Sequence, residues 1–563
     1  MKPGAPSGDT PRSPGSTARA ATVMGVATAA SRVVGLGRVL VIAAVLGTTD
    51  LGNIFSASNS VSNVLFDLLA AGALSAVLVP AFVELLAPRD RGVPDGSEDA
   101  ERLAGALLGW SLVVLGPLCL AGVIAAPAIA RLLTAATPDP AVADAQRHLA
   151  TFLLRLFLPQ VLLYALGAVS TAVLHAKRRF AVAAIAPIGY TAVMVAALLA
   201  FRALHGRGTP GLALTLGERL VLGAGGTLAV AAFVGIPTIA LWRSGFRLRP
   251  RAPRRAKVPG LRRAVRLSGW AGLQHAGTGL LLAAALIVGM GVSGGVVAYQ
   301  VAFASFLVPY SVFALPFITA VLPELAGDAG RGDLGAFGRS LRWALDGMVG
   351  LVVPVSVAAV VFGPRVMEAL AYGQTTGTGG RLIGFALGGL AVGLLPYGAF
   401  LLFVRAHYAL GEGRAPAIAA LGSAALGAAL MGIVGGMAHG EARLVAMGAA
   451  HSAAYLVGSA VLGAGLARRT GQPLAPACLG RSVLVAGSLG GVCATVLAAI
   501  DPAGRLATLA AVAGLAAVAG AVYAVLARPG RPARSRPPGY GVSPESQCAD
   551  REEQVGPAGV RQS

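Results

Sequence analysis

Long apolar segments separated by short polar or basic connections run through most of this chain. Windows of about 19 residues identify about fourteen segments that are long enough to cross a bilayer as helices. Ala, Gly, Leu and Val dominate them, which favours close helix packing in lipid over strands. We therefore expect an all-α polytopic membrane protein with about 14 transmembrane helices. The predicted spans lie near 22–46, 61–86, 103–130, 149–175, 181–203, 219–241, 268–290, 296–322, 341–363, 382–410, 416–438, 443–466, 481–500 and 505–527.

The apolar segments contain a weak internal repeat. The segment SAVLVP (75–80) resembles TAVLP (319–323), and Leu158-Pro159 resembles Leu395-Pro396. Both pairs are separated by roughly 240 residues and six helices, which predicts two six-helix lobes as parallel repeats plus two C-terminal helices. The predicted domains are a disordered N-terminus (1–20), an N-lobe (21–242), a basic linker (243–266), a C-lobe (267–467), two further helices (468–527) and a disordered tail (528–563).

The first apolar segment carries two arginines, Arg32 and Arg38. An arginine at the centre of a spanning helix costs roughly 2.5–3.5 kcal/mol, so it normally faces a protein interior or a water-filled cavity. A bend at Gly35 or Gly37 would turn both guanidinium groups into one space. We interpret that space as a site for an anionic headgroup. The alternative is an interfacial helix in which Arg32 reaches the membrane surface.

The second segment carries a polar stripe. Asn59, Asn63 and Asp67 recur every four residues and therefore share one helical face. Polar groups within lipid need internal partners, and Asp67 could balance Arg32 or Arg38. The stripe either lines a cavity or forms a hydrogen-bonded seam between helices.

Further polar residues occur on the later segments. Gln274 and His275 lie on the seventh segment, where they would line the opposite wall of the cavity. Tyr299 and Gln300 begin the eighth segment, and we expect them at the membrane interface. His407 lies near the end of the tenth, and we expect it to reach toward the surface.

Composition supports the membrane assignment, since 56% of the residues are hydrophobic and 12% are charged. The net charge of +21 comes mostly from basic connections between apolar segments, which places both termini in the cytoplasm and gives no nucleic-acid signature. Four cysteines form no CxxC pair. We expect no metal, no cofactor and no enzymatic activity, because the sequence lacks catalytic motifs.

Four motifs carry a family resemblance: SRVVGLGR (31–38), GALSAVLVP (72–80), LHAKRRF (174–180) and RAHYALGEGRAP (405–416). Together they resemble the signature segments of the MurJ/MviN lipid II flippases, over about residues 20–525.

The resemblance implies a two-lobed fold of the multidrug/oligosaccharidyl-lipid/polysaccharide exporter superfamily. It implies alternating access that moves undecaprenyl-pyrophosphate-linked peptidoglycan precursor (lipid II) to the outer leaflet of the cell membrane. Ser31, Arg32 and Arg38 match the motif whose arginines meet the pyrophosphate. Lipid II, membrane lipids and the cell-wall synthesis machinery are the implied partners.

Some positions depart from the family pattern. Asn53 stands where the family often has Asp, Ala71 replaces an acidic residue, and Gln300 follows Tyr299 where many members have Arg. The eleventh and twelfth segments contain no acidic residue. The substrate is therefore left open between lipid II and another polyprenyl-linked glycan. A small-molecule antiporter of the same superfamily and a membrane scaffold are further alternatives.

Overall fold

The structure is a computed structural model that describes residues 35–66, 81–86, 97–177, 179–206, 208–251 and 261–527. These residues form helices and connections without any strand. Eleven of the described helices are long and apolar enough to cross a membrane, or twelve if the bent pair α14–α15 is one span. The all-α polytopic fold class is therefore confirmed. The predicted count of fourteen is not confirmed, because the first two expected spans extend into residues outside the described ranges.

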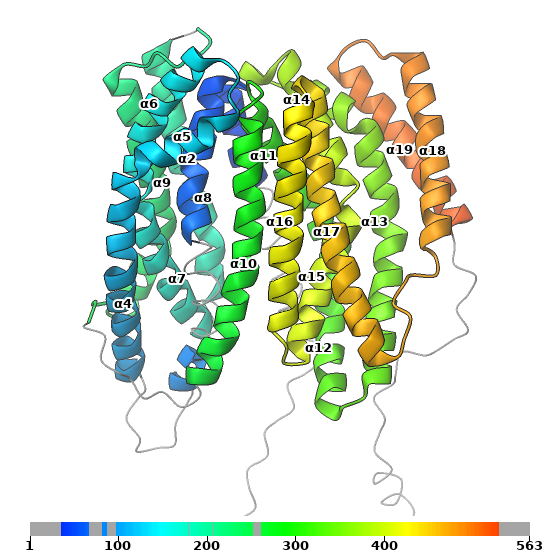
Figure 1. The fold of residues 1–563 in the computed structure, drawn as a ribbon, viewed down its shortest axis with the longest axis horizontal. Coiled ribbons are helices and arrows are strands. Elements are labelled where there is room, and N and C mark those ends of the chain that lie inside the picture. Colours follow the sequence, from blue (N-terminus) through cyan, green and yellow to red (C-terminus); the bar gives the residue numbers. More distant parts are fainter. Residues whose placement is uncertain are drawn as a thin grey trace, which may run out of the picture.

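The first half of the molecule, as we use the term, comprises the helices up to α9 (Figure 1). Its first described element is the helical stretch Gly35–Leu46. There follow α2 (Asp50–Phe66), a turn of helix at 81–85, α4 (Ser97–Ile124), α5 (Ala126–Leu133), η2 (Thr134–Ala136), α6 (Pro140–Phe157), α7 (Gln160–Ala176), α8 (Phe180–His205) and α9 (Leu216–Arg243).

The second half comprises α10 to α17, and two further helices follow it. Its elements are α10 (Leu261–Gly289), α11 (Gly295–Pro309), η3 (Tyr310–Ala314), α12 (Leu315–Arg331), α13 (Leu334–Leu370), η4 (Gly373–Thr375), α14 (Thr378–Ala391), α15 (Leu394–Ala409), α16 (Arg414–Met437) and α17 (Gly440–Thr470). The last helices are α18 (Leu479–Ile500) and α19 (Arg505–Leu526).

The third to fourteenth expected spans correspond in order to helices or helix pairs from α4 to α19. The start of the second span was predicted wrongly, since α2 begins at Asp50 and not near residue 61. Thr49 explains the early start, because its hydroxyl accepts a hydrogen bond from the Gly52 amide in the manner of a helix N-cap. The first turns of α2 are buried against other helices, so they do not need the apolar side chains that lipid contact requires.

Prolines mark the irregular points of the spans. α6 and α7 are separated at Leu158-Pro159, and α14 and α15 meet at an angle of 51° shortly before Pro396. A π-helical segment, Tyr310–Ala314, lies between Pro309 and Pro316. Proline lacks the backbone N–H that a regular helix uses, so a break or a wider turn satisfies the remaining groups.

Each half has its own large apolar core. The core of the first half includes Phe55, Phe157 and Phe201, and that of the second half includes Phe306 and Phe337. Leu286, Met290 and Val296 of the second half pack into the core of the first half. The lobe boundaries given above stay a prediction.

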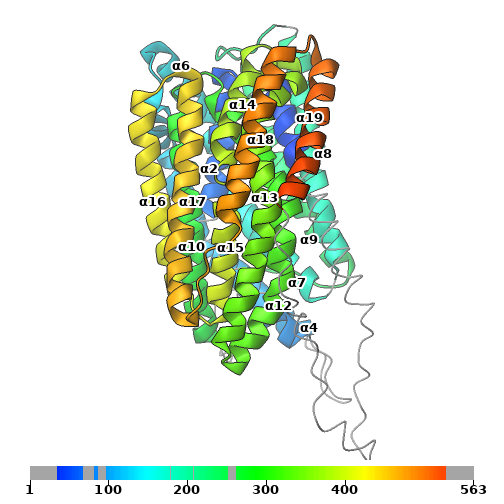
Figure 2. The same cartoon turned by 90° about the vertical axis from the view of Figure 1, so that its right-hand side faces the viewer.

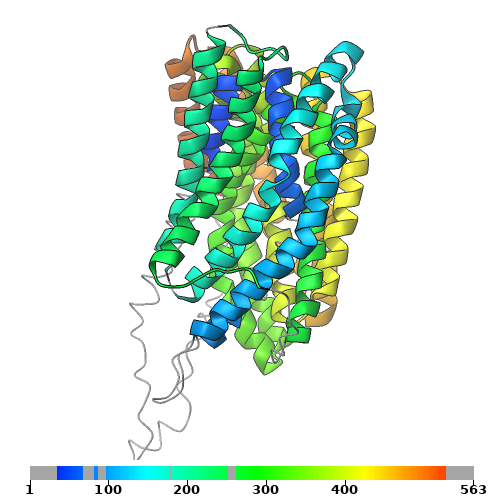
Figure 3. The same cartoon turned by 90° about the vertical axis from the view of Figure 1, so that its left-hand side faces the viewer.

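The helices α18 and α19 stand at one side of the molecule, where both pack on α13 (Figure 2). Figure 3 shows the opposite side, which α4 (blue) crosses obliquely in front of the other helices.

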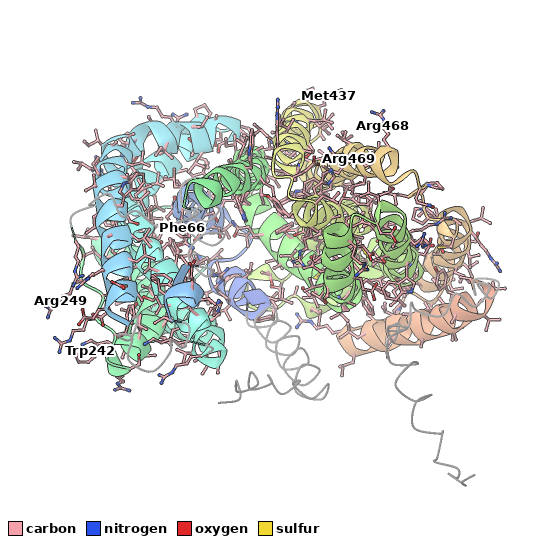
Figure 4. The ribbon with its side chains drawn as sticks, turned by 90° about the horizontal axis from the view of Figure 1, so that it is seen from below. Phe66, Trp242, Arg249, Met437, Arg468 and Arg469 are labelled. Atoms are coloured by element: carbon pink, nitrogen blue, oxygen red, sulfur yellow. The ribbon has the colours of Figure 1, made fainter. Side chains whose placement is uncertain are left out.

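Basic residues gather at one end of the helices. Arg243 ends α9, Arg339 and Arg342 lie in the first turns of α13, and Arg468 and Arg469 lie in the last turn of α17. We call this the basic end and the other the far end. Figure 4 looks onto the basic end, where Arg249 and Arg468 lie at the outer edges and Phe66 lies among the helices of the first half.

Small residues allow α14 and α17 to approach closely. A Cβ atom added at Gly448 would lie 2.6 Å from the Leu390 amide nitrogen and 2.8 Å from the Ala386 carbonyl oxygen. Both atoms are backbone and cannot turn away as a side chain would. The crossing therefore depends on glycine at position 448.

We expect Gly448→Ala to destabilise the protein by about 1–3 kcal/mol, because the added methyl forces two backbones apart. Thermal unfolding in detergent measures the effect. The matched control is Gly432→Ala in α16, where an added Cβ meets nothing within 4 Å. Equal unfolding temperatures for the two variants would contradict the close crossing.

Candidate functional site

The sequence-predicted site residues fall into two groups. Ser31, Arg32 and Asp67 lie outside the described residues. Arg38, Asn59, Asn63, Gln274 and His275 are described, and only part of this group comes together.

Arg38 and Asn59 meet at a tyrosine that the sequence analysis did not single out. The Arg38 guanidinium carbon lies 4.8 Å from the centre of the Tyr190 ring, and the Asn59 amide nitrogen donates to the Tyr190 hydroxyl at 3.4 Å. The helix Gly35–Leu46, α2 and α8 each contribute one of these residues, which we call the Tyr190 cluster. Lone aromatic residues are common in apolar helices, so only the fold reveals the role of Tyr190.

Within the described residues, the Tyr190 cluster keeps hydrogen-bonding groups without a partner. Arg38 forms no ion pair with a carboxylate of the described residues, and the buried Asn59 side-chain oxygen has no partner there. The ring face stabilises the cation but leaves the guanidinium N–H groups available to an acceptor. The arrangement can therefore receive an oxyanion such as a phosphate.

The other polar groups of α2 hold neighbouring helices. Ser62 donates to the Gln160 side-chain oxygen at 3.0 Å, and Gln160 donates to the Thr227 hydroxyl at 3.1 Å. Asn63 donates to the Asn59 carbonyl oxygen within α2 at 3.4 Å. Ser62 is not part of the predicted stripe, and the Asn63 bond stays within α2, so Asn59 is the described stripe residue that bonds to another helix. Whether the stripe forms a seam or lines a cavity stays a prediction.

Gln274 and His275 occupy the second half. The Gln274 side-chain oxygen accepts from the Tyr408 hydroxyl at 2.7 Å, whereas His275 is exposed. The structure gives neither residue a contact with the Tyr190 cluster. Their role as a second cavity wall stays a prediction.

Two residues expected near the membrane surface, Tyr299 and His407, are buried instead, and a third, Gln300, is half-buried. Tyr299 is 2% exposed and hydrogen-bonds to His451, and Gln300 donates to Ser60 of α2 at 3.0 Å. His407 is buried, with its Nδ1 bonded to the Phe403 carbonyl oxygen at 2.8 Å. The assignments of Tyr299 and His407 to the membrane surface were wrong, because helix packing and not distance along the span decides which end residues are covered. The assignment of Gln300 stays a prediction.

The two halves are joined at the far end by Asn53. The fully buried Asn53 amide nitrogen donates to the Val292 carbonyl oxygen at 2.8 Å, and its oxygen accepts from the Val296 amide at 2.9 Å. Asp50 bonds to Ser293 beside it. A single side chain of α2 therefore fixes both the α10–α11 connection and the first turn of α11.

The family model for the lipid II flippase MurJ matches residues 42–517. The chain belongs to the MurJ family. The matched segment starts just after Arg38 and contains the other described site residues. A probable lipid II flippase MurJ of Rhizobium tropici is 26% identical over 62% of this chain and 62% of its own length. The corresponding protein of Rhizobium meliloti is 26% identical over 70% of this chain and 71% of its own length.

Solved structures show the same fold. A lipid II flippase MurJ in an inward closed conformation gives a TM-score of 0.65 at 17% identity, covering 90% of this chain and 99% of that one. An inward-facing MATE multidrug transporter of the MOP superfamily gives 0.57 at 16% identity, covering 78% and 94%. This MurJ family member is thus a multi-pass membrane protein with the transporter fold of that superfamily.

We expect Asn53→Ala to loosen the far end, because the buried Val296 N–H loses its acceptor at a cost of about 1–3 kcal/mol. Thiol labelling of a cysteine introduced at Val292, in a background without native cysteines, should accelerate about fivefold or more.

The matched control is Asn63→Ala, because the Asn63 amide bonds to a carbonyl of its own helix. Asn53→Asp keeps an acceptor for the Val296 amide, so its labelling rate should lie between those of Asn53→Ala and Asn63→Ala. Unchanged labelling in Asn53→Ala would show that other contacts close the far end.

Proposed function

We propose that this protein moves lipid II from the cytoplasmic to the outer leaflet of the cell membrane by alternating access. The match of the MurJ family model to residues 42–517 carries this proposal. The Tyr190 cluster supports it, because a half-buried arginine without a carboxylate partner among the described residues suits a pyrophosphate.

The orientation follows from charge. Cytoplasmic connections of membrane proteins carry the excess of Lys and Arg, so the basic end and both termini lie in the cytoplasm. The far end, where Asn53 joins the two halves, then faces outward. We assign no enzymatic step to the protein, and we expect the cell-wall synthesis machinery to be its partner.

An apolar groove of about 660 Å³ offers a place for the polyprenyl chain. It lies between α13, α18 and α19 and is lined by residues such as Leu351, Val357, Leu489 and Ala516. Within the bilayer an isoprenoid chain is already out of water, so what it gains in the groove is van der Waals packing against the helices. The two helices outside the predicted repeat thus gain a function in holding the lipid part of the substrate.

The alternative substrates differ from lipid II in their charge or in the glycan that the polyprenyl chain carries. A cationic drug would be repelled by an arginine-containing site, whereas any polyprenyl-pyrophosphate glycan would satisfy both the Tyr190 cluster and the groove. Comparing lipid II with other polyprenyl pyrophosphates in reconstituted vesicles separates the glycans.

Arg38→Ala should slow lipid II translocation in proteoliposomes by about tenfold to a hundredfold, because a charge-assisted hydrogen bond contributes about 1.5–3 kcal/mol. Arg38→Lys keeps the positive charge but lacks the planar guanidinium group. Its translocation rate should therefore lie between those of wild type and Arg38→Ala. The control is Arg468→Ala at the outer edge of the basic end. Full translocation after replacement of both Arg32 and Arg38 would remove the proposal.

Gly520→Leu should fill the groove and slow translocation of the long-chain substrate, while a short-chain analogue moves at the wild-type rate. Gly520 lines the groove and has room for a side chain, since an added Cβ meets nothing within 4 Å. Gly514→Leu on the same helix has the same room and does not line the groove. Equal slowing of both substrates would argue against a chain-binding groove.

A further inference from the structure

His451 is a buried titratable residue that the proposed transport site does not use. It lies in the middle of α17 and is 6% exposed. Its Nδ1 is 2.6 Å from the Tyr299 hydroxyl of α11, while its Nε2 has no partner among the described residues. A buried imidazole nitrogen without a partner needs an explanation, since most buried polar atoms are hydrogen-bonded.

The Tyr299 hydroxyl fits both charge states of His451. A hydroxyl can donate to a bare ring nitrogen or accept from an N–H, so Nδ1 is satisfied whether the ring is neutral or protonated. His407 differs, because its Nδ1 faces the Phe403 carbonyl oxygen, which only accepts. His407 therefore has a fixed tautomer and the features of a packing residue.

Aromatic rings surround the imidazole. The ring centres of Phe303 and Tyr455 lie 5.3 and 5.1 Å from that of His451, with planes tilted by 54° and 43°. Electron-rich ring faces attract a cation in an environment without water. The rings can thus lessen the cost of an imidazolium at this place, but they do not replace the hydration that it loses when the site closes.

The charged residues of the neighbouring elements lie elsewhere. On α17, Arg443 is two turns before His451 and donates to the Ala438 carbonyl oxygen, and Glu441 pairs with Arg381 of α14. The titratable groups that face the ring are Tyr299 from α11 and Tyr455, with Tyr397 of α15 against Tyr455. Among the described residues no carboxylate would cancel a proton bound at His451.

A polar route leads toward the ring. Tyr455 hydrogen-bonds to Thr278 of α10, and Thr278 is exposed. A void of about 10 Å³ between Thr278, Tyr455 and Ser423 is of the size that one water occupies. Thr278, this void and Tyr455 connect the surface with the wall of the His451 site.

We propose that His451 is a proton-binding site of the transport cycle. One proton adds to Nε2 when a conformational change admits water to the ring, and the same proton returns to water when the helices close. Because a cation loses hydration on burial, protonation and closure oppose each other, and each shifts the population of the other. This inference rests on the proposed function, because it takes the proton bound at His451 to accompany the anionic headgroup of the transported lipid.

Histidine 15N NMR on the full chain in nanodiscs tests the site directly. Among the histidine signals recorded over the pH range in which the protein stays folded, one that titrates should be absent from His451→Gln but present in His407→Gln. A His451 signal that stays constant over that range would overturn the proposal. His451→Asn, which also keeps a hydrogen-bonding group, serves if His451→Gln does not fold.

Translocation as a function of pH then tests the coupling. The rate of lipid II translocation by wild type and by His407→Gln should change severalfold over the titration range. The rate in His451→Gln should not depend on pH. An unchanged pH profile in His451→Gln would assign the coupling to another group and overturn the proposal. If no variant moves lipid II while the His451 signal still titrates, the proton site stands and the proposed substrate is wrong.

Discussion

A guanidinium group inside lipid-embedded helices must be stabilised by its neighbours, and the Tyr190 cluster shows how this protein meets that constraint. The ring of Tyr190 stabilises Arg38, and the structure pairs Arg38 with no carboxylate of the described residues. A carboxylate at this place would cancel the charge and compete with any anion. The ring keeps the cation in the span and leaves its N–H groups for a ligand, so the selectivity we propose for pyrophosphate depends on this contact.

The joint between the two halves also relies on uncharged side chains. Asn53 closes the far end through neutral hydrogen bonds to backbone atoms, and Gln300 reaches Ser60 in the same way. Neutral bonds can break and reform without moving a charge through lipid. The Asn53 and Gln300 bonds can therefore break without moving a charge. The Asp50–Ser293 bond and the apolar contacts of Leu286, Met290 and Val296 must also part when the halves separate.

Hydropathy predicted most of the fold because lipid contact selects apolar residues directly. It failed at α2, Tyr299 and His407, where helices cover polar residues and lipid exerts no selection. The lysine- and arginine-rich connections predicted the basic end for a similarly direct reason.

The candidate site was harder to predict. Asn59 and Arg38 were found because polar groups are rare in spans, and the structure brings both to one ring. Tyr190 was missed, since a lone tyrosine carries no signal until the fold places it beside a cation. Gln274 and His275 were chosen as polar groups of an apolar segment, and such a pattern does not fix which way a side chain points.

Photocrosslinking at position 190 tests the central claim most directly. With a benzoylphenylalanine in place of Tyr190, labelled lipid II should form an adduct that excess unlabelled lipid II suppresses. The same residue in place of Trp242, at the outer edge of the first half, should give no such specific adduct. Specific labelling at 242 and none at 190 would contradict the account.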